Sequence, residues 1–123
     1  MSSDDAIGFL EDERDRLVEL VVVAKKNLID SDDRSVNNKY LEIKDDAIIL
    51  LHKILDYIIL LKVERPPAQS IVSELRCLSI ESKAASAEYL ADRYSVESMR
   101  RHLQAAKTQI KTMLLLRLSK AAL

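Results

Sequence analysis

The chain is poor in residues that make turns and covalent cross-links. Its 123 residues include one glycine, two adjacent prolines (Pro66 and Pro67) and one cysteine, Cys77. A multi-stranded sheet needs a turn after each strand, so this shortage disfavours a β fold, and the abundance of Leu, Ala, Glu, Lys and Arg favours helix. The single cysteine excludes an internal disulfide. We therefore predict an all-α protein.

The sequence also has no long uninterrupted apolar run. The most apolar stretch, Ala47–Leu61, is interrupted by His52, Lys53 and Asp56, and it is shorter than the roughly 20 apolar residues that a membrane span needs. No N-terminal segment resembles a signal peptide, so we expect a cytoplasmic protein. On a helix the three polar residues lie close together, and we expect this stretch to form a central helix that is covered on several sides.

Turn-forming and capping residues divide the chain into helices. The run DSDDRSVNN (30–38) favours a turn, because its side chains bond to their own backbone, and Pro66 and Pro67 end the following helix. Serines between 79 and 86 leave open whether the next helix continues or breaks, and Ser95 can cap the last one. We predict one domain, 1–123, that folds as a bundle of four to five mostly antiparallel helices. The expected helices are 4–29, 37–63, 67–79, 82–94 and 96–121.

The first and last helices each show a seam of apolar residues at heptad spacing. In the first helix the seam is interrupted by Arg14 and consists of Ile7, Leu10, Leu17, Val21, Ala24 and Leu28. In the last helix it consists of Val96, Met99, Leu103, Ala106, Ile110 and Met113. We expect both seams to face the core.

The C-terminal end is apolar nearly all round, since it reads MLLLRLSKAAL. Its leucines cannot all face one core, and together with 47–61 they exceed the apolar surface that one bundle covers, so we predict a two-fold homodimer. The predicted interface anchors are Met113, Leu114, Leu115, Leu116 and Leu118. The predicted basic rim is Arg100, Arg101, Lys107 and Lys111, in a segment that carries no acidic residue after residue 100. Residues 1–65, by contrast, carry fifteen acidic and ten basic side chains.

Carboxylates are the first candidates for chemistry. One set, Asp12, Asp15 and Glu19, shares a helix face, and a second set, Glu42, Asp45 and Asp46, opens the next helix. Two antiparallel helices could bring both sets together around Mg²⁺. The segments DRLVEL (15–20) and EIKDDAIILL (42–51) resemble the all-α nucleotide pyrophosphatases of the MazG kind, which pair an E-E-x-x-E run with a later E-x-x-D. This chain departs from that pattern, because Arg16 stands at a carboxylate position and Asp15 at a glutamate position. The resemblance implies Mg²⁺-dependent hydrolysis of a nucleoside triphosphate to its monophosphate.

Segment 87–104, AEYLADRYSVESMRRHLQ, is similar to a helix-turn-helix unit. Its second helix would present Arg100, Arg101, Gln104 and Lys107 to DNA. The spacing argues against this interpretation, because Arg101 stands where such units bury an aliphatic residue, and the turn has no glycine.

The histidines and the cysteine are weaker candidates. His52 lies beside Lys53, as in histidine phosphotransfer domains, but Asp56 stands one turn later where a small residue would admit the phosphate donor. We therefore expect a half-buried His52 that is bonded to a neighbour. Cys77 is expected in the core, and His102 has no plausible second metal ligand nearby.

The chain has no glycine-rich phosphate loop, paired-cysteine motif or nucleophile elbow. We therefore predict a non-catalytic protein, without cofactor or metal, that binds another protein and itself. It would be a regulator, an adaptor or chaperone, or a subunit of a larger complex, with a groove between amphipathic helices that receives a partner's helix. Nucleic-acid binding through 87–104 and Mg²⁺-dependent pyrophosphatase activity are the alternatives.

Overall fold

The computed structural model describes the backbone of residues 3–63 and 69–122, and the side chains of residues 5–63 and 69–114. These residues form four helices and no strand. The helices are α1 (Ser3–Asp30), α2 (Arg34–Val63), α3 (Gln69–Ala91) and α4 (Val96–Ala122). The predicted all-α helical bundle is confirmed.

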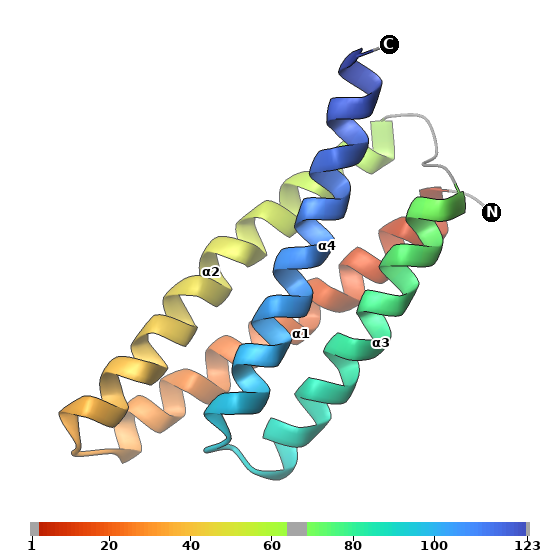
Figure 1. Cartoon of the computed structure of the whole chain (residues 1–123). Helices are drawn as coiled ribbons and strands as arrows, with labels where there is room; N and C mark the ends of the chain where they lie inside the picture. The colour runs from red at the N-terminus through yellow and green to blue at the C-terminus, as the bar shows by residue number, and fades with distance from the viewer. Residues whose placement is uncertain (1–2, 64–68, 123) are drawn as a thin grey trace.

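The four helices stand at the corners of a bundle in which α1/α2 and α3/α4 are antiparallel neighbours, whereas α1/α3 and α2/α4 are parallel neighbours. Consecutive helices run in opposite directions (Figure 1), and α1 and α4 each pack against both α2 and α3. Cavities lie along three of these four contacts, between α1 and α3, α2 and α4, and α3 and α4. Within the described ranges, none of the helices combines the length and the apolar character that crossing a membrane requires.

Capping side chains determine where two of the helices begin. α2 starts at Arg34, three residues before the expected position, because Asp33 Oδ1 accepts hydrogen bonds from the backbone N–H groups of Ser35 (2.9 Å) and Val36 (3.5 Å). At α4 the expected cap is confirmed, since Ser95 Oγ accepts a bond from the Ser98 N–H at 3.4 Å. Both contacts satisfy backbone donors that the first turn of a helix leaves unpaired.

One helix, α3, occupies the region where two short helices, 67–79 and 82–94, were expected. Ser79, Ser82 and Ser86 are buried in its middle. They continue the inward row of Val72 and Leu75 at spacings of three and four residues, and this row ends at Tyr89. Serine therefore marks core positions in α3, and the helix does not break there.

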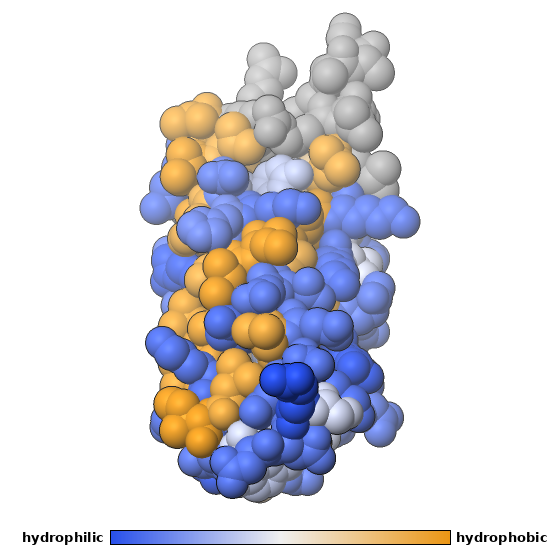
Figure 2. All heavy atoms as spheres, turned by 90° about the vertical axis from the view of Figure 1, so that its left-hand side faces the viewer, coloured by the Kyte–Doolittle hydropathy of each residue, from blue (hydrophilic) through white to orange (hydrophobic). Residues whose placement is uncertain are grey.

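The expectation that 47–61 is a central, widely covered helix is wrong. The segment belongs to α2, a corner helix that buries one row, which includes Ala47, Leu50 and Ile54. Ile49 and Ile59, by contrast, are 54% and 62% exposed. Figure 2 shows apolar side chains gathered in a band along the side of the molecule where α2 lies. The core uses only part of the apolar surface of α2.

Candidate functional site

The core contains several buried polar side chains, and two of them lie on α1. The buried positions of α1 are spaced by four and three residues, and they place the side chains of Glu13 and Asn27 inside together with those of leucine and alanine. The row is Ala6, Leu10, Glu13, Leu17, Leu20, Ala24 and Asn27, and Ile7 beside Ala6 is buried as well. The expected seam through Val21 and Leu28 is wrong by one position at these turns, since both are only half-buried. Glu13 therefore takes a core position that a neutral residue would normally occupy.

Glu13 is fully buried, and donors from three helices surround its carboxylate. Its Oε2 accepts bonds from Arg16 Nη2 at 2.7 Å and Nε at 3.1 Å. The same oxygen accepts bonds from Ser82 Oγ at 2.6 Å and Gln109 Nε2 at 3.1 Å. Burying a carboxylate is costly unless it is paired and hydrogen-bonded, and Glu13 meets both conditions.

A chain of hydrogen bonds continues from the other carboxylate oxygen. His102 Nε2 lies 2.7 Å from Glu13 Oε1, and His102 Nδ1 lies 2.8 Å from the Tyr89 hydroxyl. The rings of His102 and Tyr89 are stacked, with their centroids 5.7 Å apart. One arrangement of hydrogens satisfies all three groups: the Tyr89 O–H donates to Nδ1, and the Nε2–H donates to Glu13. We call Glu13, Arg16, Ser82, Tyr89, His102 and Gln109 the Glu13 cluster.

The cluster changes the acidity of two of its members. Burial by itself would raise the pKa of Glu13, but the hydrogen bond from His102, the charge of Arg16 and the Ser82 hydroxyl outweigh it and lower the pKa of Glu13 below 4.5. Burial raises the pKa of Tyr89, and the negative charge of Glu13 raises it further. The folded chain therefore favours an ionised Glu13 and a protonated Tyr89.

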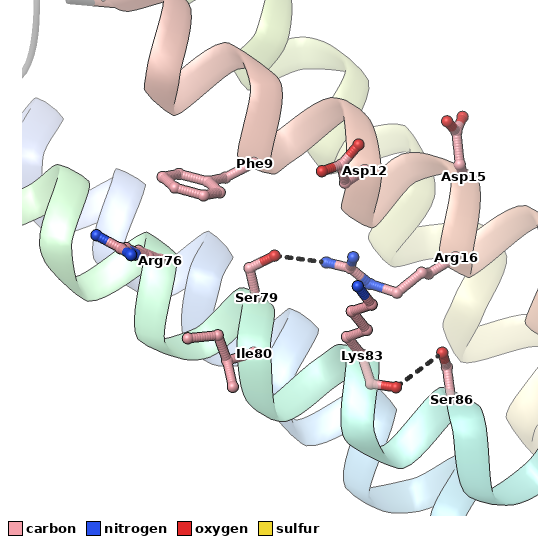
Figure 3. A pocket seen from close by; sticks show the side chains of 9 residues that line it. All are labelled: Phe9, Asp12, Asp15, Arg16, Arg76, Ser79, Ile80, Lys83 and Ser86. Carbon is pink, nitrogen blue, oxygen red and sulfur yellow. Dashed lines mark hydrogen bonds between the residues drawn. The ribbon is translucent and has the colours of Figure 1, made fainter. Parts of the chain in front are cut away.

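Arg16 connects this cluster to the surface. Its side chain is 13% exposed and lines a pocket between α1 and α3 with a volume of about 630 Å³. Its Nη2 also donates to Ser79 Oγ, at 3.1 Å, in the wall of the pocket (Figure 3). The other cations of the pocket are Arg76 and Lys83, both on α3. We call this cavity the α1–α3 pocket.

The predicted interface residues lie partly along a different groove. Leu114 is exposed, whereas Met113 is buried in the core, and the side chains of Leu115, Leu116 and Leu118 lie outside the described residues. All four side chains of the predicted basic rim are exposed: Arg100, Arg101, Lys107 and Lys111. Three of them line two adjoining cavities between α2 and α4, of about 350 and 270 Å³, which share Asp46 and Lys107. We call these cavities the α2–α4 groove.

The two carboxylate sets do not meet. Asp12 and Asp15 line the α1–α3 pocket, whereas Glu42 and Asp46 line the α2–α4 groove beside basic residues of α4. Among the side chains of 5–63 and 69–114, no three His, Cys, Asp or Glu groups come together as metal ligands. The juxtaposition around Mg²⁺ that the pyrophosphatase resemblance requires is therefore not found in this part of the chain.

The remaining candidates also lie elsewhere than expected. His52 and Cys77 are both exposed, so the expectations of a half-buried histidine and a core cysteine are wrong. The helices that flank residues 92–95 lie side by side and antiparallel (Figure 1), whereas the two helices of a helix-turn-helix unit cross at about 90–120°. His102, for which no metal partner was expected, is buried against Glu13.

Glu13, Tyr89 and Gln109 were not among the candidate residues predicted from the sequence. The sequence did contain a signal for Glu13. If the seam passes through position 20 and not 21, the same spacing places position 13 in the core. The more apolar seam runs through Val21 and Leu28, and that seam does not include Glu13.

Comparison with known proteins provides no homologue from which a function could be transferred. No protein-family model, curated protein or solved structure matches this chain. The function of the chain must therefore be inferred from its own surfaces and cavities.

Proposed function

We propose that this protein has no catalytic role and works by binding other proteins, as a homodimer in the cytoplasm. It would serve as a regulator, an adaptor or chaperone, or a subunit of a larger complex. The observation that supports this proposal is the exposed apolar surface that α1 and α2 share after the core is filled.

This surface follows two lines of side chains on neighbouring helices. On α1 the line contains Val18, Val22 and Ile29, and all three are exposed. On α2 the exposed members are Leu41 and Ile59. Half-buried Ile48 and Leu55 lie between these two at heptad spacing on α2. We call these seven residues the α1–α2 face.

A second copy of the chain is the occupant we propose for the α1–α2 face. An interface around a two-fold axis uses the same patch on both subunits, so one apolar surface suffices for both sides. Arg14 and Lys25 lie in the same line of α1 at spacings of three and four residues, and their long side chains can cover the apolar surface while their charges stay in solvent.

We expect the purified chain to be a dimer and Ile59→Asp to be a monomer. A carboxylate in the α1–α2 face would be buried without a partner, and this weakens association strongly. Light scattering at several concentrations measures the mass, and circular dichroism checks that the helices remain. Ile80→Asp is the matched control, because Ile80 is 62% exposed, as Ile59 is, but lies on α3. A monomeric wild type, or equal dissociation of both variants, would contradict the proposal.

For the other protein we propose the α2–α4 groove. Ile49, Leu50, Ile110 and Leu114 form its apolar part, and Lys53, Lys107 and Lys111 lie around them. This combination fits an amphipathic helix that carries an apolar stripe flanked by acidic residues. The groove also contains several residues of the interface predicted from the sequence.

We expect a photocrosslinking amino acid at position 49 to capture a partner segment of this type in cells. The control position is 90, since Leu90 is 48% exposed, as compared with 54% for Ile49, but belongs to α3. Mass spectrometry of the crosslinked peptide reads its sequence, and Lys107→Glu together with Lys111→Glu should abolish capture by repelling an acidic helix. Equal capture at both positions, or a basic captured peptide, would argue against this role of the groove.

A further inference from the structure

The α1–α3 pocket has the size and the lining of a small-molecule site. Its volume of about 630 Å³ lies within the range of ligand pockets. Three cationic side chains line it, Arg16 from α1 and Arg76 and Lys83 from α3. Apolar side chains, Phe9 and Ile80, line it as well.

Arg16 is held in position before any ligand arrives. Its Nε and Nη2 are bonded to Glu13 on one side, and Ser79 and Ser82 accept further bonds from them. Within the described side chains, Nη1 donates to no acceptor. A guanidinium that is fixed in this way loses little conformational entropy when it binds an anion through its remaining N–H groups.

Arg76 and Lys83 add positive charge from the opposite wall. They are seven residues apart on one face of α3, with Ile80 between them. Neither has a carboxylate within 4.0 Å among the side chains that the structure describes. Figure 3 shows Lys83 extending from α3 toward Arg16 on α1. The charge of Arg16 is balanced by Glu13, whereas Lys83 beside it has no such counterion among the described side chains, so an anion in the pocket would be attracted mainly by the charge of Lys83.

The carboxylates of the pocket lie at its α1 edge. Asp15 is exposed, accepts a bond from Arg14 Nε at 3.0 Å and points away from α3 in Figure 3. Asp12 is also exposed, and its carboxylate is not within 4.0 Å of any cation in the described side chains. The α3 wall of the pocket is therefore positive, and its acidic edge faces solvent.

The geometry points to a binding site for a small organic anion in the α1–α3 pocket. A phosphate or carboxylate group would bind between Arg16 and Lys83, with Arg76 farther along α3, because the free Nη1 of Arg16 and the ammonium of Lys83 can each donate a charge-assisted hydrogen bond to it. The rest of the ligand would be apolar or aromatic and would pack against Phe9 and Ile80. This site is independent of the protein-binding surfaces proposed above.

The test is a titration followed by ¹H–¹⁵N NMR, with phenyl phosphate, phenylacetate, inorganic phosphate and neutral benzyl alcohol as probes. We expect saturable shifts of the Arg16 Nε–H signal and of amides in 76–83 with phenyl phosphate, phenylacetate or both. Whichever of these two probes binds more tightly identifies the anionic group, phosphate or carboxylate, that the pocket prefers. Inorganic phosphate should bind more weakly because it lacks the apolar part, and benzyl alcohol should cause no saturable shift.

Variants distinguish binding in the α1–α3 pocket from a general attraction of anions to the basic residues of the surface. Lys83→Gln should weaken binding by about tenfold, since it removes a charge-assisted hydrogen bond, and Arg76→Gln should weaken binding less, since it removes only a nearby positive charge. Both side chains are exposed and lie outside the Glu13 cluster, so folding should be retained. Lys111→Gln on α4 is the matched control and should leave the affinity unchanged. The proposal is overturned if no probe gives saturable shifts, if benzyl alcohol binds as well as the anions, or if the control weakens binding equally.

Discussion

Glu13→Ala is expected to lower the free energy of unfolding by about 3–5 kcal/mol, the cost typical of removing one partner of a buried ion pair. The substitution leaves the Arg16 charge without its counterion, and it leaves the Nε2–H of His102 and the amide of Gln109 without their acceptor. Since small domains are stable by only about 5–15 kcal/mol, this one change would remove a large part of the total. Urea unfolding at pH 7, followed by circular dichroism, measures the difference.

One control variant separates the effect of the Glu13 cluster from a general effect of removing a carboxylate. Asp12→Ala, one position earlier on the exposed surface of α1, should change stability by no more than about 0.5 kcal/mol. A loss below about 1 kcal/mol in Glu13→Ala would mean that the cluster is not a closed, desolvated network.

The same cluster should make stability depend on pH in a defined direction. Because the folded chain lowers the pKa of Glu13 below 4.5, the unfolded chain binds a proton there first as the pH falls. The stabilisation from ionised Glu13 is therefore complete above about pH 6, and it is lost as the pH falls from about 4.5 through the folded pKa. The difference in stability between wild type and Glu13→Gln should shrink over that range, and a constant difference down to about pH 3 would contradict the interpretation.

Ile54→Ala is expected to cost about 2–5 kcal/mol, whereas Ile49→Ala should cost no more than about 0.5 kcal/mol. Ile54 is fully buried in the row of α2 that faces the core, so its loss leaves a cavity. Ile49 is 54% exposed on the same helix and in the same apolar stretch. Chemical denaturation of both variants provides the comparison.

This pair of variants tests which face of α2 points inward. Equal losses at positions 49 and 54 would mean that both side chains are buried, as in the central helix that the sequence had favoured. A larger loss at position 49 would mean that α2 is rotated about its axis relative to the structure.

Local chemistry in the sequence was sufficient for much of the architecture. The shortage of glycine and the position of Pro66 and Pro67 predict helices and the end of α2, because these residues act on the backbone around them. The seam of α4 is also readable, since the side chains of Met99, Leu103 and Ala106 are clearly more apolar than their neighbours, and all three are buried.

The packing of the helices decided which row of α1 is buried, because the spacing of its apolar residues allows two rows. On α1 two heptad rows one residue apart are both partly apolar, and only the contact with α3 and α4 selects the one that contains Glu13. That choice depends on Ser82, His102 and Gln109, which lie 69 to 96 residues away in the chain and supply donors to the carboxylate.

Composition and local spacing by themselves therefore determined that this protein is a bundle of helices, where α2 ends and which face of α4 is buried. The tertiary structure alone decided that α2 is a corner helix with an exposed apolar side, and that Glu13 is a core residue. The physical reason is that burial of a charge, or exposure of an isoleucine, depends on which partners surround it. Those partners are brought together only when all four helices pack.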